Sequence, residues 1–217
     1  MADINQHKRM GAKKMNGSFL GKALAYMKTK LSILPKQIQS DFQKNLVKFR
    51  DVCLIHRAQI DNGGGKYPLL RTSNNKRVGY SDFQEDKLEG GQNVAVTRLK
   101  IGYSMVASGD SGFGAANESN VRYSDKAADL PNVLLSSVLS ITQDNNTVFR
   151  QPISALVSEE SMRGNASSAA LDLEIPFLLV ERKPINVEIQ FPEGEGTSES
   201  DKHFFEFQLF GVETASK

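Results

Sequence analysis

Beyond residue 50, apolar and polar side chains alternate in one segment after another, and no helical period is long enough for a helix that crosses between parallel strands. The clearest case is Ile185, Val187, Ile189 and Phe191, which alternate with polar residues. Such alternation predicts strands with one buried face. Strands joined without crossovers pair antiparallel, and half-apolar strands bury that face when two sheets pack together. The pattern therefore predicts a mainly β fold, an antiparallel β-sandwich of jelly-roll type.

Six to eight strands are expected in this sandwich. Within 93–107 the apolar register moves by one residue, from Val94 and Val96 to Leu99 and Ile101, and this slip predicts a β-bulge. A polar loop is expected at 158–170. The strand segments are 52–60, 93–107, 133–141, 148–157, 171–180, 185–191 and 205–209.

Residues 1–50 have a different, helical period. A helix is predicted over 19–33, and Pro35 is expected as the first residue of a second helix. The apolar positions expected to pack are Leu20, Leu24, Met27 and Leu31 in the first helix and Ile38, Phe42, Leu46 and Phe49 in the second. The chain is therefore divided into a partly helical arm, 1–50, and a β-sandwich domain, 51–217.

The electric charge changes sign at the same boundary. Of the 27 basic and 25 acidic residues, eleven basic and two acidic lie in 1–50, which gives +9. The remaining 16 basic and 23 acidic residues give the rest of the chain −7. A charge asymmetry of this size indicates a basic arm with a partner of its own.

Several partners fit this arm. Lysines along a segment neutralise phosphates and release counterions, so nucleic acid is one candidate. An amphipathic basic helix can also dock on its own acidic body or on a neighbouring copy, lie on a membrane surface, or remain a solvated tail. The residues expected to make these contacts are Lys8, Arg9, Lys13, Lys14, Lys22, Lys28 and Lys30.

No catalytic or metal-binding pattern is found, and no cofactor is expected. The histidines, His7, His56 and His203, lack the local spacing of a metal site, and no nucleophile motif occurs. The single Cys53 excludes an internal disulfide and is expected to be a small buried hydrophobe. No stretch is apolar enough for a transmembrane helix or a signal peptide.

The stretches GGQNVAVTRLKIGYS, LDLEIPFLLVERKPINVEIQFPEGEG and HFFEFQLFGVETASK resemble the paired long strands of capsid-type jelly rolls. Together with the basic arm, they make the chain similar in organisation to bacteriophage virion structural proteins. This resemblance implies a particle component present in many symmetric copies, with the arm directed inward or joining neighbours.

The sequence therefore favours a non-enzymatic structural protein of a virus or phage particle, made in the host cytoplasm and located in the virion. Its expected partners are further copies of itself and other virion proteins, with nucleic acid or an inner membrane of the particle as further partners of the arm. The alternative is a β-sandwich module that binds nucleic acid or carbohydrate. Aromatic side chains clustered on one exposed face would support that alternative, and the candidates are Tyr67, Tyr80, Tyr103 and Tyr123.

Overall fold

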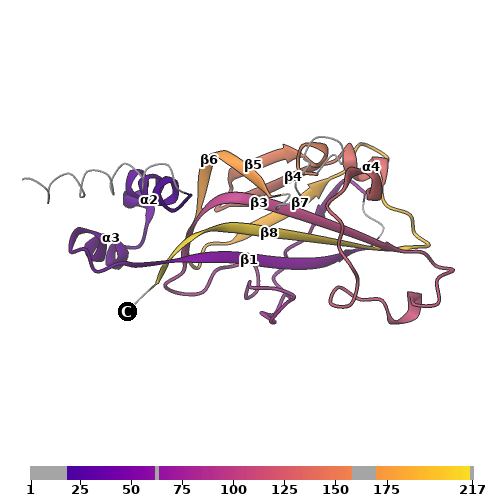
Figure 1. Cartoon of the computed structure of the whole chain (residues 1–217), viewed down its shortest axis with the longest axis horizontal. Helices are drawn as coiled ribbons and strands as arrows, with labels where there is room; N and C mark the ends of the chain where they lie inside the picture. The colour runs from indigo at the N-terminus through magenta and orange to yellow at the C-terminus, as the bar shows by residue number, and fades with distance from the viewer. Residues whose placement is uncertain (1–18, 62–63, 158–169, 216–217) are drawn as a thin grey trace, which may run out of the picture.

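The structure is a computed structural model that describes residues 19–61, 64–157 and 170–215. Eight antiparallel strands form two four-stranded sheets, as predicted (Figure 1). The strands are β1 (Lys48–Ile60), β2 (Lys66–Pro68), β3 (Asn93–Val106), β4 (Val138–Gln143), β5 (Asn146–Pro152), β6 (Leu171–Leu179), β7 (Ile185–Gln190) and β8 (Lys202–Ala215). The α-helices are α2 (Phe19–Thr29), α3 (Lys36–Gln43) and α4 (Asn132–Leu135), and the 3₁₀ turns are η1 (Leu31–Ile33), η2 (Phe113–Ala115), η3 (Ala127–Asp129) and η4 (Ile153–Ala155).

The strand pairing is that of a jelly roll. The first sheet has the order β1-β8-β3-β6, and the second has the order β2-β7-β4-β5. The pairs β1·β8, β2·β7, β3·β6 and β4·β5 are all antiparallel. Strands one to four therefore pair with strands eight to five in reverse order, as in a long hairpin rolled into two sheets. The expected fold class is confirmed.

The core lies between the two sheets and follows the alternation of the sequence. In β8, Phe205, Phe207 and Leu209 are buried in the main core, while Glu206 and Gln208 lie on the other face of the strand. Burial of apolar side chains from both sheets is the main force that holds such a sandwich together. The first sheet therefore has an outer face, and this face carries the features discussed below.

The predicted bulge in β3 is confirmed by a register shift between Val96 and Arg98 against both neighbouring strands. Opposite the bulge, a Cβ atom on Gly211 would lie 2.1 Å from the carbonyl oxygen of Ala95. Glycine is therefore required at position 211, because any side chain would force β3 and β8 apart.

The edge strand β6 is irregular. Phe177 pairs with Val96 but Asp172 pairs with Arg98, so β6 has more residues than β3 along this stretch. The irregular stretch contains Pro176, which cannot donate a backbone hydrogen bond and suits an edge strand.

Three local expectations are corrected by the structure. The alternating segment 133–141 begins as the short helix α4, and β4 begins only at Val138. Pro131 directly precedes α4, and within this helix Leu134 is fully buried while Val133 and Leu135 are only half-buried. The first helix ends at Thr29 and is followed by the turn η1, instead of continuing to residue 33. Pro35 precedes the second helix, which begins at Lys36.

Cys53 is exposed, contrary to the expectation of a buried side chain. Its neighbours Val52 and Leu54 face the core, so alternation turns Cys53 to the outer face of β1. The polar loop expected at 158–170 lies outside the described residues except for Ala170.

Candidate functional site

The helix α2 packs against the outer face of the first sheet, at the end of the molecule where β1 begins (Figure 1). Ala23 and Met27 are fully buried there. They form a second apolar cluster that is separate from the main core. The sheet contributes Ala95 of β3, Val212 of β8, Leu178 of β6 and Val180, which directly follows β6. The helix α2 therefore docks on the β-sandwich of its own chain, which is one of the partners considered for the arm.

The apolar stripe expected in the first helix is rotated in the structure. Met27 is buried as expected, and Leu24 and Leu31 are half-buried, but Ala23, which the expected stripe did not include, is fully buried. The side chain of Leu20 lies outside the described residues.

The second helix contributes less to this packing. Ile38 is buried, and half-buried Phe42 meets Phe49 of β1 edge to face, with 5.3 Å between ring centroids. Leu46, expected to pack, is 41% exposed, and Ile33 is 51% exposed.

The lysines expected to contact a partner have different positions. Lys22 donates from Nζ to the carbonyl oxygen of Leu173, in the irregular part of β6, so it helps to fix α2 on the sheet. Lys28 and Lys30 are exposed. The other expected contacts, Lys8, Arg9, Lys13 and Lys14, lie outside the described residues.

A buried carboxylate connects the arm to the sheet. Glu213 of β8, whose side chain is 1% exposed, is ion-paired with Arg50 at the start of β1. It also accepts a hydrogen bond from Gln92 Nε2 at 3.0 Å. Removing either partner would leave part of a buried charge uncompensated.

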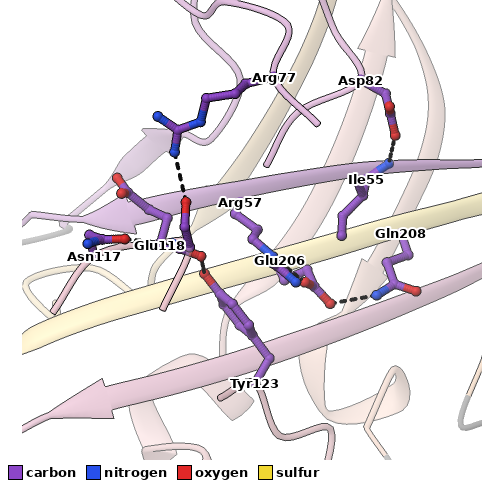
Figure 2. A network of polar contacts seen from close by, with 10 residues as sticks. Ile55, Arg57, Arg77, Asp82, Asn117, Glu118, Tyr123, Glu206 and Gln208 are labelled. Atoms are coloured by element: carbon purple, nitrogen blue, oxygen red, sulfur yellow. Dashed lines mark hydrogen bonds and ion pairs between the residues drawn. The ribbon is translucent and has the colours of Figure 1, made fainter. Parts of the chain in front are cut away.

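Further along the outer face, a polar network covers the sheet (Figure 2). The guanidinium group of Arg57 donates to Glu206 at 2.6 Å, and Gln208 donates to the same carboxylate at 2.6 Å. Arg57 also lies over the ring of Tyr123, 4.9 Å from its centroid. A Cβ atom on Gly102 would lie 2.9 Å from the Cβ atom of Tyr123, so the glycine allows the segment that carries Tyr123 to approach the strand closely.

Two loops are fixed over the outer face and the β1 edge by this network. Tyr123 donates to the carbonyl oxygen of Glu118 at 2.9 Å, and Arg77 donates to Ser119 at 2.7 Å. Asp82 accepts from the backbone amide of Ile55 at 2.8 Å, which covers part of the free edge of β1. Figure 2 shows these contacts converging from segments that are far apart in the sequence.

The tyrosines proposed as stacking platforms are not open. Tyr67 and Tyr103 are buried. Tyr80 and Tyr123 are half-buried, and Arg77 and Arg57 lie over their rings. Burial raises the pKa of both Tyr80 and Tyr123 above the ordinary value.

The two described histidines have both ring nitrogens occupied. His56 donates from Nε2 to the carbonyl oxygen of Leu69 at 3.0 Å, because that oxygen can only accept, and its Nδ1 accepts from Ser81 at 2.9 Å. His203 lies 2.6 Å from the hydroxyl of Tyr103 through Nδ1 and 2.9 Å from Ser198 Oγ through Nε2.

The direction of the second chain of hydrogen bonds can be assigned. Ser198 must donate to the carboxylate of Asp201, 2.7 Å away, so it accepts from His203 Nε2, and Tyr103 donates to Nδ1. In this arrangement His203 is a donor to the serine, not a base that accepts its proton. One signal of this buried network is visible in the sequence, because His203 occupies an inward position of the alternating strand β8.

Stability is expected to depend on pH through His56. Burial lowers the pKa of His56 from 6.5 to about 4. The folded protein therefore binds this proton less readily than the unfolded chain, so stability is full above about pH 6.5 and falls by about 3 kcal/mol as the pH decreases to about 4. Burial also lowers the pKa of His203, which acts in the same direction.

Urea unfolding at a series of pH values measures this dependence. The His56→Gln variant, which keeps an amide donor for Leu69 but cannot titrate, should lose most of the slope between pH 6.5 and 4. A slope that is the same in both proteins would contradict the assignment to His56.

Among the residues that the structure describes, no group of three or more His, Cys, Asp or Glu side chains is arranged to hold a metal ion. No helix in the described ranges is long and apolar enough to cross a membrane.

No protein-family model matches the sequence, and a search of curated proteins finds no match. A comparison with solved structures finds the decameric BFDV capsid protein, which is 8% identical with a TM-score of 0.29. The match covers 78% of this chain and 100% of that one. Both the identity and the TM-score are low, and the fold described above rests on the strand order of the chain itself.

Proposed function

We propose that the protein is a non-enzymatic structural subunit of a virus or phage particle that assembles through its β-sandwich. The observation that carries this proposal is the strand order, in which β1·β8, β2·β7, β3·β6 and β4·β5 form a complete jelly roll. Eight-stranded jelly rolls serve as viral capsid, lectin and cupin domains.

Two features favour the capsid class among these. His56 and His203 both occupy inward positions of their strands. The nitrogens of each ring are hydrogen-bonded to neighbouring protein groups, so the two rings do not converge on a shared metal ion. The half-buried tyrosines of the outer face are covered by arginines, so they do not offer the open ring faces that sugar or base stacking needs.

The basic segment supports the same proposal. It lies at one end of the sandwich, with α2 fixed to the body and with exposed lysines on α2 and α3. The segment before it carries Lys8, Arg9, Lys13 and Lys14, which suit a contact with nucleic acid, with an inner membrane of the particle or with a neighbouring subunit. The partners of the assembled subunit would be further copies and other virion proteins, and its location would be the virion after synthesis in the host cytoplasm.

Expression of the full chain followed by electron microscopy and light scattering tests the proposal. We expect closed particles or regular oligomers, and nuclease treatment of the purified material will show whether nucleic acid is enclosed. A protein that stays monomeric at all concentrations and salt conditions, alone and with nucleic acid, would overturn the structural role.

A further inference from the structure

The described part of the arm makes one end of the molecule basic. Residues 19–50 contain seven basic side chains and one acidic side chain, a net charge of +6. The segments beside this end, 84–92, 144–145 and 180–184, contain three basic and five acidic residues, and Glu213 is ion-paired with Arg50, so the end keeps a net charge of +3. The basic residues are Lys22, Lys28, Lys30, Lys36, Lys44, Lys48 and Arg50, and the acidic residue is Asp41.

The opposite end of the sandwich is acidic. Loops 107–131 and 191–202 contain eight acidic and three basic residues, a net charge of −5. The two loops form one surface, because Ser108 donates its backbone N–H to Asp201 at 3.0 Å and Lys202 donates from Nζ to the carbonyl oxygen of Phe113 at 2.7 Å. The acidic residues are Asp110, Glu118, Asp125, Asp129, Glu193, Glu195, Glu199 and Asp201.

The strand β1 and its partner β8 separate these two ends. The arm enters β1 at Lys48, which pairs with Ala215, whereas the acidic loop 191–202 leads into β8 next to His203, which pairs with Ile60. Figure 1 shows these strands along the longest axis of the molecule. The 13 residues of β1 span about 40 Å at ~3.3 Å per residue. Screening in physiological salt acts over about 8 Å, so the two ends of one chain cannot neutralise each other.

Each end also carries an exposed apolar side chain beside its charges. Ile33 and Leu46 are 51% and 41% exposed at the basic end. Met105, near the end of β3 at the acidic end, is 51% exposed. Opposite charge together with exposed apolar groups suits an interface that is electrostatically guided and apolar at its centre.

We propose that the basic end of one copy binds the acidic end of a second copy of this chain, in a head-to-tail contact. Such a contact uses two different surfaces, so it continues from copy to copy and closes into a ring or shell when the rotation allows. This inference rests on the proposed function, because it names the surfaces through which the subunit assembles.

Charge reversal on each end tests the contact. The basic-end variant is Lys30→Glu with Lys36→Glu, and the acidic-end variant is Glu193→Lys with Glu195→Lys; all four side chains are exposed. A control variant, Thr72→Glu with Val78→Glu, adds two negative charges at exposed positions of the loop that lies beside the middle of β1, where Arg57 donates its backbone N–H to Tyr80. Nuclease-treated full-length proteins are compared by sedimentation velocity over a range of concentrations.

We expect each single-end variant to associate at least about tenfold more weakly than the unmodified protein, and the control to associate normally. A mixture of the two single-end variants should recover association between unlike copies, because the unmodified acidic end of one variant can bind the unmodified basic end of the other. A chain with all four substitutions retains only +2 in residues 19–50 and −1 in the acidic loops, so it should associate as weakly as the single-end variants. Association of the unmodified protein should weaken as salt is raised.

Other outcomes separate the two proposals. If the unmodified protein assembles but the mixture of single-end variants associates no better than either variant alone, the head-to-tail contact is wrong while the structural role remains. If the basic-end variant loses binding to an oligonucleotide but associates normally, that end binds nucleic acid and the inference is overturned. If nothing assembles under any condition, the proposed function itself fails.

Discussion

Replacing Arg57 by alanine is expected to lower the free energy of unfolding by about 4 kcal/mol, because it leaves the carboxylate of Glu206 buried without its cation. The side chain of Glu206 is 5% exposed, and its ion pair with Arg57 is 2.6 Å long. Gln208 would still donate to this carboxylate, but a neutral amide does not replace the charge. The same substitution removes the cation above the ring of Tyr123, so the loop around Tyr123 should also become more mobile.

A double variant and a surface control separate these effects. Arg57→Ala combined with Glu206→Gln removes both charges and should regain part of the lost stability in guanidinium unfolding. Lys183→Ala, which breaks the exposed ion pair with Asp144 at 2.9 Å, should change stability by less than about 1 kcal/mol. If Arg57→Ala costs no more than Lys183→Ala, Glu206 does not depend on Arg57.

Most of the architecture could be predicted from local sequence, because the strands are half-buried and their periods are visible. Phe205, Phe207 and Leu209 indicate their own burial, and the slip between Val96 and Leu99 indicates the bulge. The segment 133–141 has the same alternation, yet its first part is helical. There the local pattern misleads, because the choice between helix and strand depends on Pro131 and on the burial of Leu134 in the core.

The contacts on the outer face could not be predicted in this way. Arg57 and Glu206 are 149 positions apart, and Lys22 and Leu173 are 151 positions apart. Each contact exists only because the jelly roll places the first strand beside the last and α2 beside β6. A lysine that reaches a backbone carbonyl has no local signature, so composition alone groups Lys22 with the exposed Lys28 and Lys30.

The strongest effect on the arm is expected from Met27→Asp, which places a charge in the apolar cluster beneath α2. Met27 is fully buried against Ala95, Leu178 and Val212. Losing a buried methionine costs about 2–5 kcal/mol, and an unpaired buried charge adds to this cost. The total is limited by the free energy with which α2 docks, because the helix can detach instead. We therefore expect a loss of about 5 kcal/mol if the docked helix is essential to the fold, and a smaller loss if the sandwich folds without it.

Hydrogen exchange and chemical unfolding distinguish these two results. Detachment of α2 alone should increase exchange in α2 and leave the amides of the main core, such as those around Phe207, protected. Global destabilisation should increase exchange in both regions and lower the unfolding midpoint. The matched control is Ala25→Asp, at an exposed position of α2, which makes the same charge change without entering the cluster. If Met27→Asp behaves like this control, α2 is not held by the contact with Ala95, Leu178 and Val212. In that case the arm is free to act as a separate segment, and the boundary near residue 50 is a division between two independently moving parts.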